Sequence, residues 1–236
     1  MMYTNVLPRQ AQALQRVFGY MAGRNQTHGD EARTSLDGFT VALSYEAGTP
    51  GHEIAAEVGA RLHWPIYDHE LVEWIAQELA LPVAVVEEMD ERRQSWLLEC
   101  MEAFVSKPEL SECRYTRHLI ALIHSLGEQG RCVIVGRGAA YILPSQSTLR
   151  VRLVGEPEDR IAAFSRRLQL DRSTAARKVE EINRERQRFI REHFHVDPTK
   201  ARNYDLVLNT SQWSPADCAD FIVQALHHKD IGHLNG

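Results

Sequence analysis

The feature of the sequence that most constrains the fold is an uninterrupted apolar run, CVIVG, at residues 132–136. Such a run is typical of a strand that is buried on both faces, as in a parallel sheet covered by helices. Four further runs have strand character, and they alternate with stretches whose apolar residues recur at helical spacing. They are GFTVALS at 38–44, WPIYD at 64–68, TLRVRLVG at 148–155 and YDLVLN at 204–209. This alternation predicts an α/β domain with a five-stranded, mostly parallel sheet.

The composition is that of an ordinary globular protein. Of the 236 residues, 44% are hydrophobic and 25% are charged, and the formal net charge of −5 argues against a dedicated nucleic-acid binder. No stretch approaches the roughly 18 apolar residues of a membrane span, and the opening MMYTNVLPRQ lacks the order of a secretory signal. The four cysteines form no CxxC pair, which favours reduced thiols. We therefore expect a cytoplasmic protein with no nucleic-acid or membrane partner.

The composition also divides the chain into parts. Apolar residues at helical spacing predict an amphipathic helix over residues 8–22, and the polar, glycine-bearing stretch after it is typical of a linker. Residues 1–37 would then be an appendage, residues 38–230 the main domain, and residues 231–236 a tail. One hypothesis for the appendage is that its helix docks on a partner or on a second copy of the chain, giving a homo-oligomer.

The loop after the first predicted strand has the context of a phosphate-binding loop. In VALSYEAGTPGHEIAAEV, residues 41–58, the chain runs from a strand through Gly48 and Gly51 into a helix. Backbone N–H groups in such a loop and at the helix start can cradle an anion, and the helix dipole adds about half a positive charge. The full GxxxxGK[ST] signature is absent. An ordinary helix start, with Thr49 as N-cap and Pro50 at the first helical position, is the alternative.

Several blocks of sequence together resemble the cytidylate kinase-like family, a branch of the P-loop nucleoside monophosphate kinases. These blocks are residues 39–71, CVIVGRGAAYIL at 132–143, LRVRLVGEPEDRI at 149–161, and residues 183–214. They follow the family's order and spacing and cover nearly all of residues 38–228. The resemblance implies a P-loop NTPase-type three-layer sandwich with a helical substrate region over 69–130 and an arginine-rich lid over 165–200. It also implies ATP- and Mg²⁺-dependent phosphoryl transfer to a nucleotide such as CMP.

The resemblance implies a set of phosphate-binding residues in the loop. The set is Ser44, Gly48, Thr49, Gly51, His52 and Glu53. Gly51 falls where true cytidylate kinases have a lysine, and Glu53 falls where their Ser or Thr hydroxyl meets Mg²⁺; the cytidylate kinase-like branch commonly has glycine and glutamate there too. Tyr45 and Pro50 depart from that branch, which has arginine and glycine at these positions. The Glu53 carboxylate could bind Mg²⁺, or it could simply be stabilised by the positive end of the helix dipole.

Arginines are the candidates for the positive charge that the loop lacks. Residues 150–191 hold twelve Lys and Arg against seven Asp and Glu, so this segment is locally basic within an acidic chain. The resemblance implies that Arg184, Arg186 and Arg188 are catalytic lid residues that close over phosphates. Helical spacing puts Arg184 and Arg188 on one face, while Arg186 points elsewhere. A solvated helix face, with its own glutamates as partners, is the alternative.

Two side chains at predicted strand ends complete the predicted site. Arg137 directly follows CVIVG, so it projects from the carboxyl end of a strand, where parallel sheets bind ligands. Its rigid fork suits a phosphate, and the resemblance implies contact with the substrate phosphate; a structural salt bridge is the alternative. Asp68 ends another strand and matches an acidic residue near the family's nucleoside site. Its alternative role is to cap the next helix.

Two hypotheses of function follow from these patterns. The first is an ATP-dependent kinase acting on a nucleoside monophosphate or another small phosphoryl acceptor, with Arg137 and the lid arginines as catalytic residues. The second is a nucleotide-binding or regulatory module that keeps the kinase fold but has lost efficient transfer. The missing loop lysine, Tyr45 and Pro50 motivate the second hypothesis.

Overall fold

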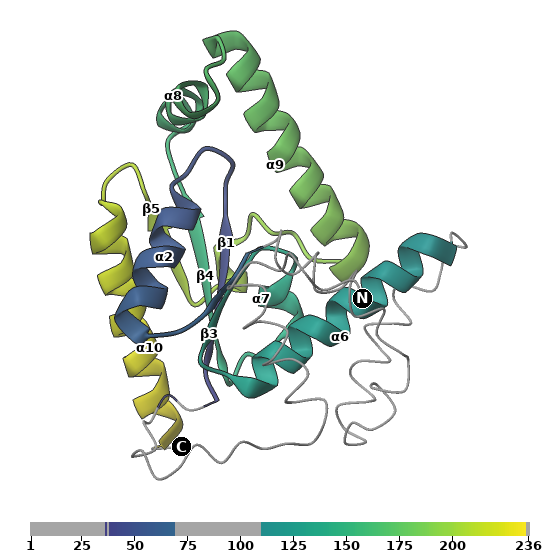
Figure 1. Cartoon of the computed structure of the whole chain (residues 1–236), viewed down its shortest axis with the longest axis vertical. Helices are drawn as coiled ribbons and strands as arrows, with labels where there is room; N and C mark the ends of the chain where they lie inside the picture. The colour runs from purple at the N-terminus through teal and green to yellow at the C-terminus, as the bar shows by residue number, and fades with distance from the viewer. Residues whose placement is uncertain (1–35, 37, 69–109, 235–236) are drawn as a thin grey trace, which may run out of the picture.

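The computed structural model describes residue 36, residues 38–68 and residues 110–234 (Figure 1). The predicted helix over 8–22 lies outside these residues, and so does the first two thirds of the predicted helical region over 69–130. Over the rest, strands and helices alternate as the sequence predicts.

The strands form one five-stranded sheet. They are β1 (Thr40–Tyr45), β2 (Ile66–Tyr67), β3 (Cys132–Val135), β4 (Thr148–Val154) and β5 (Leu206–Asn209). Their order across the sheet is β2-β3-β1-β4-β5, and every pairing between them is parallel. The predicted five-stranded sheet is therefore confirmed. Since β1 is central, the loop that follows it opens at the middle of the edge formed by the carboxyl ends of the strands.

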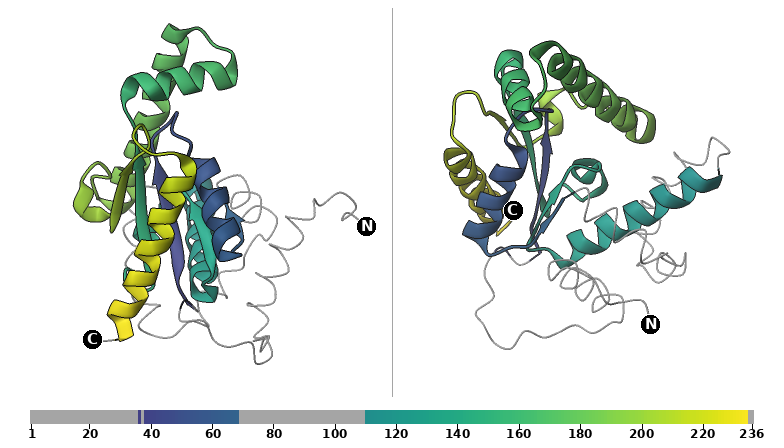
Figure 2. Two further views of the ribbon diagram at one scale, coloured as in Figure 1. Left: turned by 90° about the vertical axis from the view of Figure 1, so that its left-hand side faces the viewer. Right: turned by 45° about the horizontal axis from the view of Figure 1, so that its top comes forward.

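Helices cover both faces of the sheet and extend beyond one of its edges. They are α2 (Gly51–Leu62), α6 (Leu110–Gln129), α7 (Ala139–Ile142), α8 (Pro157–Leu168), α9 (Arg172–Phe194) and α10 (Pro215–Leu234), with a short 3₁₀ turn at Ala201–Asn203. Helices α2 and α10 lie together on one face, and α6 and α7 lie on the other (Figures 1 and 2). This makes the predicted three-layer sandwich. Helices α8 and α9 form a hairpin that rises beyond the carboxyl ends of the strands.

The main core lies between the sheet and the layer of α2 and α10. On β1, Val41 and Leu43 point into this layer and are fully buried, together with Ile54 of α2 and Ile222 of α10. All four residues of β3 are buried, as the uninterrupted run CVIV predicts for a strand covered on both faces. Within the described residues, no helix is both long enough and apolar enough to cross a membrane.

A cluster of charged side chains joins β4, β5 and α10 near the edge of the sheet where the amino ends of the strands lie. The Asp205 carboxylate accepts hydrogen bonds from Arg150 at 2.9 Å and from Lys229 at 2.8 Å. Lys229 also donates to the carbonyl oxygen of Thr148 at 2.7 Å. Burial alone would raise the pKa of Asp205, but these hydrogen bonds outweigh burial and hold the pKa below its usual range.

We predict that Asp205→Asn lowers the free energy of unfolding by about 1–3 kcal/mol at pH 7, because the amide leaves Arg150 and Lys229 without their anion. The pKa of Asp205 is lower in the folded state than in the unfolded state, where it is near 4. The carboxylate therefore contributes fully to the free energy of unfolding above that unfolded pKa, and this contribution is lost as the pH falls through the folded pKa. Urea denaturation at pH 7 and at pH 3 measures both effects.

The matched control for this prediction is Asp220→Asn, which removes a more exposed partner of Arg61 and should leave stability nearly unchanged. The account of the cluster is wrong if Asp205→Asn is as stable as the parent at pH 7. It is also wrong if the difference between the two proteins is equally large at pH 3.

Candidate functional site

The topology brings the predicted strand-end residues to one edge of the sheet. Ser44 is the next-to-last residue of β1, Asp68 directly follows β2, and Arg137 comes two residues after the end of β3. Because β3 lies between β2 and β1, the segment with Arg137 separates Asp68 from the loop after β1. The three predicted positions therefore share the edge where parallel sheets bind ligands.

The loop after β1 makes a tight turn around Gly48. Both the backbone N–H and the hydroxyl of Thr49 donate to the carbonyl oxygen of Glu46, at 3.2 and 2.8 Å. Gly48 has a φ of +90°, and a Cβ there would lie 2.3 Å from the carbonyl oxygen of Arg160. Helix α2 begins at Gly51 with Pro50 at the cap position. The alternative in which Thr49 caps the helix is therefore wrong, since its hydroxyl is used within the turn.

The start of α2 offers backbone donors to an anion. Gly51, His52 and Glu53 form its first turn, where N–H groups have no carbonyl acceptor within the helix. Pro50, at the cap position, has no side-chain oxygen that could accept from them. The helix dipole favours negative charge at the same point. Loop and helix start therefore fit a phosphate group.

The same turn contains the one carboxylate predicted as a magnesium ligand. Glu53 is exposed in the first turn of α2. Among the residues that the structure describes, no three His, Cys, Asp or Glu side chains gather as a metal site would require. Mg²⁺ at phosphoryl-transfer sites is usually held by one or two carboxylates, substrate phosphates and water. A single glutamate beside a phosphate loop fits that kind of ion and does not fit a metal held by protein alone.

The ring of Tyr45 lies over the beginning of α2. A Cβ placed on Gly51 would lie only 2.5–2.8 Å from atoms of this ring, so the ring fills the space in which a side chain at position 51 would begin. The Tyr45 hydroxyl and Nε2 of His52 are 2.9 Å apart, and the two rings meet edge to face. The ring is thus fixed at both ends, by its own strand and by α2.

Helix α9 brings one predicted lid arginine to this ring. The guanidinium carbon of Arg186 lies 4.6 Å from the centre of the Tyr45 ring, and its Nη1 donates to the Tyr45 carbonyl oxygen at 3.1 Å. Arg184 instead pairs with Glu180 at 3.3 Å on the exposed face of the helix, and Arg188 is exposed. The structure therefore brings Arg186 to the loop and leaves Arg184 with the glutamate partner that the solvated-face alternative expects.

Helix α9 also touches the loop through residues that the sequence reasoning missed. Asn183 accepts a hydrogen bond from the backbone N–H of Ala47 at 2.8 Å. The side chain of Ala47 is buried among Phe164 of α8 and two small apolar residues of α9, Ala175 and Val179. The sequence does indicate that residues 183 and 186 share a helix face, because they are three positions apart. It does not indicate what this face contacts, because the loop is more than a hundred residues away in the sequence.

Glu46 is a second residue that the sequence reasoning missed. Its carboxylate lies 3.6 Å from a guanidinium nitrogen of Arg152 and 3.4 Å from Nε of Arg160, and all three side chains are largely buried. Arg160 further donates to the carbonyl oxygens of Gly155 and Ala47, at 2.9 and 3.3 Å. These contacts fasten the loop to β4 and α8 and keep the Glu46 charge neutralised.

Arg137 stands in an unusual backbone conformation. Gly136, Arg137 and Gly138 have φ values of 78°, 53° and 75°, a run of left-handed residues directly after β3. A side chain at positive φ costs of the order of 1 kcal/mol, and such strain concentrates at functional positions. A Cβ on Gly138 would lie 2.6 Å from the ring of Phe194, so the turn packs closely under α9. The turn after β3 and the loop after β1 therefore both pack against α9, the first near Phe194 and the second near Asn183 and Arg186.

A cavity of about 350 Å³ adjoins the loop on its other side. Gly48, Thr49 and Pro50 line it from the loop, and Arg160 and Arg166 line it from α8. The turn after β5 closes it with the hydroxyl-bearing residues 210 and 211. A ligand whose phosphates lie on the loop would have room here for a further group.

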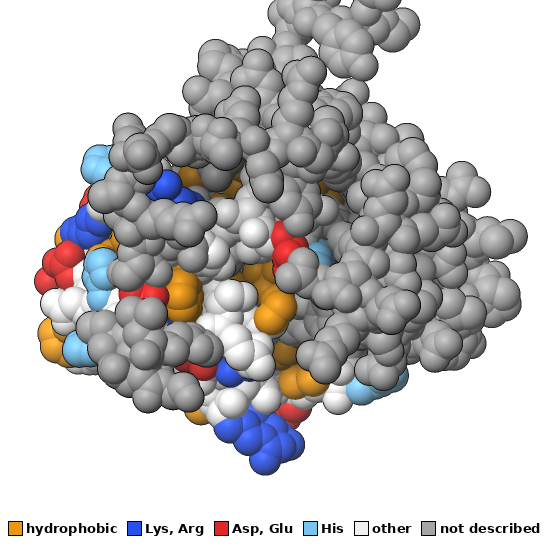
Figure 3. All heavy atoms as spheres, turned by 90° about the horizontal axis from the view of Figure 1, so that it is seen from below, with side chains coloured by type: hydrophobic (Ala, Val, Ile, Leu, Met, Phe, Trp, Pro, Cys, Tyr) orange, Lys and Arg blue, Asp and Glu red, His pale blue; other side chains and the backbone are white. Residues whose placement is uncertain are grey.

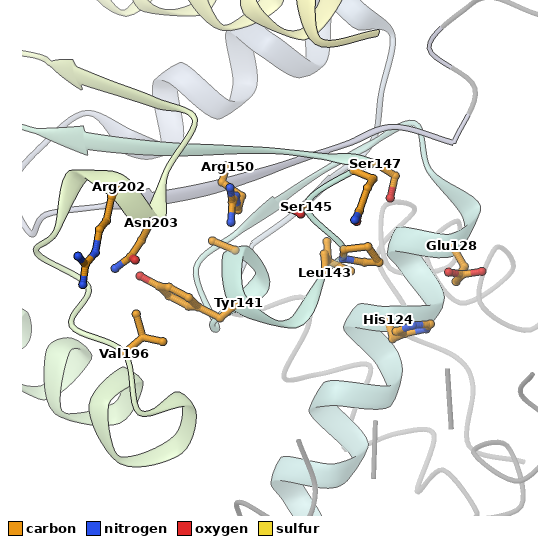
Figure 4. A pocket seen from close by; sticks show the side chains of 13 residues that line it. His124, Glu128, Tyr141, Leu143, Ser145, Ser147, Arg150, Val196, Arg202 and Asn203 are labelled. Atoms are coloured by element: carbon orange, nitrogen blue, oxygen red, sulfur yellow. The ribbon is translucent and has the colours of Figure 1, made fainter. Parts of the chain in front are cut away.

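A larger cavity, of about 770 Å³, lies elsewhere (Figure 4). It is lined from α6 and α7, from the segment before β4, and from the segment between α9 and β5, so it lies toward the amino ends of these strands. The hydroxyl of Tyr141, one of its lining residues, is 2.6 Å from the hydroxyl of Tyr204, and burial raises the pKa of Tyr141 well above its ordinary value. Seen from that edge, the described surface mixes acidic, basic and apolar side chains (Figure 3).

The fold defines an α/β protein with a parallel five-stranded sheet of order β2-β3-β1-β4-β5 and a glycine-bearing loop after its central strand. Residues 40–212 match the sequence profile of the cytidylate kinase-like family, which is well over half of the chain. The protein belongs to that family.

Individual proteins that resemble this chain are distant from it in sequence. The cytidylate kinase of Methanopyrus kandleri is 30% identical over 108 residues, which are 42% of this chain and only 56% of that protein. A solved structure of an uncharacterized protein from Eubacterium ventriosum superposes with a TM-score of 0.66 at 19% identity, over 80% of this chain and 98% of its own. The shikimate kinase of Bacteroides thetaiotaomicron reaches a TM-score of 0.47 at 12% identity, too low to add to the argument. The second relative supports the fold alone.

We predict that Gly48→Ala destabilises the protein by clearly more than Gly38→Ala. The two glycines have nearly the same φ, +90° and +93°, so both variants bear a similar backbone cost of about 1–2 kcal/mol. Only at Gly48 would the new Cβ meet backbone atoms, whereas a Cβ at Gly38 has nothing within 4 Å. The clash adds about 1–3 kcal/mol. Urea denaturation of both variants measures the difference, and equal losses would contradict the close packing of the loop on α8.

Proposed function

We propose that the protein transfers a phosphoryl group from ATP to a nucleoside monophosphate, with a CMP-like acceptor. The observation that carries this proposal is the convergence at one sheet edge of an anion-binding loop, the Arg137 turn and the Arg186 guanidinium. Membership of the cytidylate kinase-like family supports the same class of reaction.

The loop is the proposed site for the triphosphate of ATP. Backbone donors of Gly48 and of the first turn of α2, together with Ser44 and His52, would surround the phosphates, and Thr49 would keep the turn in shape through its two hydrogen bonds to Glu46. The adjoining cavity of about 350 Å³, with Arg160 and Arg166 in its wall, offers room for the rest of the nucleotide. When bound, Mg²⁺ supplies charge neutralisation for the phosphates, and Glu53 is the side chain that would help to hold it.

The acceptor is proposed to lie on the β2 and β3 side of the loop. Arg137 would hold its phosphate through two parallel N–H donors, and the strained turn would keep the guanidinium fixed before the acceptor arrives. Asp68, at the end of β2, would bind a polar group of the nucleoside. Positioning of this kind converts an encounter of two substrates into a reaction within one complex.

The reaction itself needs no covalent intermediate with the protein. A phosphate oxygen of the acceptor attacks the γ-phosphorus, the bond from that phosphorus to the bridging oxygen of ATP breaks, and ADP leaves with the electron pair. The chain's own contribution is to hold both partners in line and to neutralise charge on the transferring group. Arg186 is already at the loop, whereas Arg184 and Arg188, the other two predicted lid arginines, lie on a different face of α9.

A second candidate function rests on the loop composition. Gly51 stands where the loop lysine of true cytidylate kinases would be, and Pro50 removes one backbone donor from the cradle. A nucleotide-binding or regulatory module would bind ATP and CMP without turnover. The same domain limits apply in either case, with residues 38–230 as the functional unit, residues 1–37 as an appendage for a partner, and the cytoplasm as the place of action.

We predict that the purified protein with ATP and Mg²⁺ phosphorylates at least one member of a panel of nucleoside monophosphates, and that Arg137→Ala lowers kcat/KM at least 100-fold, about 3 kcal/mol. Arg131→Ala is the matched control, because Arg131 also has positive φ but lies at the amino end of β3. Binding of ATP and CMP by calorimetry without turnover would favour the regulatory module. Absence of both binding and turnover would sink both candidates.

A further inference from the structure

The phosphate loop has no space for the cation that its position 51 would carry. Gly51 lacks a side chain, and a Cβ there would lie 2.5 Å from the Tyr45 ring, so even a flexible lysine could not begin at this point without moving the ring. A cation on the transferring phosphoryl group is worth on the order of 10³–10⁵ in rate. If the protein transfers phosphoryl groups, the charge must come from another element.

We propose that Tyr45 is the positioning residue that holds Arg186, an arginine of the proposed site, where its charge replaces the missing loop cation. This inference rests on the proposed phosphotransferase function and names how the same site is completed. The ring that closes position 51 carries the Arg186 guanidinium at 4.6 Å, and the Tyr45 carbonyl oxygen accepts from the same guanidinium at 3.1 Å. One residue therefore excludes the lysine and recruits an arginine 141 positions further along the chain.

The surroundings of the pair are arranged to keep the guanidinium at the loop. His52, 2.9 Å from the Tyr45 hydroxyl, fixes the outer end of the ring. Asn183, one turn before Arg186, binds the backbone N–H of Ala47 and so pins the same face of α9 to the loop. An arginine held by a ring and a neutral carbonyl keeps its full charge for an incoming anion.

The acidic residue of the turn does not compete for this arginine. The Glu46 carboxylate is paired with Arg152 and Arg160 on the α8 side of the loop. Those two arginines are thus already committed to structure, whereas Arg186 is exposed and bound only through groups without formal charge in the contacts described. Electrostatics therefore favour Arg186 over Arg152 and Arg160 as the cation that meets a phosphate.

The first test compares single variants for kcat, for the acceptor KM and for the dissociation constant of ATP. Arg186→Ala should lower kcat at least 100-fold and raise the ATP dissociation constant about tenfold. Tyr45→Leu removes the ring and should lower kcat about three- to fivefold with the acceptor KM unchanged, while Tyr45→Phe keeps the ring and should stay within twofold. Arg177→Ala, an exposed arginine of α9 that contacts Thr174, is the control for lost helix charge.

The second test moves the charge back to the loop. In the double variant Tyr45→Gly with Gly51→Lys, the ring no longer blocks position 51 and a lysine stands there. Adding Arg186→Ala to this pair should then lower kcat less than tenfold, because the lysine performs the same task. An equally large loss in both backgrounds would overturn the proposal, and so would a loss below threefold in the parent.

Failure of this inference and failure of the proposed function give different results. A parent protein that phosphorylates an acceptor, with Arg186→Ala equally active, contradicts only the role of Arg186. A parent that turns over no acceptor contradicts the proposed function, and the ATP dissociation constants then decide about Arg186: equal values for parent and Arg186→Ala overturn it. Should the double variant not fold, the difference between Tyr45→Leu and Tyr45→Phe still decides about Tyr45.

Discussion

The structure depends on one constraint: β1 and β3 are buried on both faces at the centre of a parallel sheet. Backbone polar groups in such strands must be paired within the sheet, and this pairing fixes the direction and the register of β1 and β3. The segments that follow Tyr45 and Val135 must then emerge side by side at one edge. The proximity of the loop after β1 to the Arg137 turn is a consequence of core burial and needs no contact between the two segments.

The second determinant of the site is the contact between the loop and the α8–α9 hairpin. Ala47 is buried in the small apolar cluster at the base of the hairpin, and Asn183 and Arg186 bind the backbone of Ala47 and Tyr45. Gly48 allows this approach because its lack of a Cβ leaves room for the α8 backbone. The position of α9 and of its Arg186 charge is therefore linked to the conformation of the loop, so a change in one should alter the other.

The sequence was sufficient for the elements and for most of the sheet edge. The apolar run at 132–136, the helical spacing in 173–194 and the strand ends at Asp68 and Arg137 all carried local signals that the structure reproduces. The short helix Ala139–Ile142 had no such signal, since a single turn shows no periodicity. Partners separated by more than a hundred residues could not be read from spacing. The pair of Glu46 with Arg152 depends on the placement of β4 beside β1, and the pair of Tyr45 with Arg186 depends on how the α8–α9 hairpin packs.

The central claim is that the loop and the Arg137 turn hold two phosphate-bearing substrates and pass a phosphoryl group between them. The most direct measurement is ³¹P NMR of the protein with ATP, Mg²⁺ and CMP. The account predicts that ADP and CDP appear in equal amounts as ATP and CMP decline together. Release of inorganic phosphate with CMP unchanged, or ATP that persists unaltered with every nucleoside monophosphate tried, would contradict it.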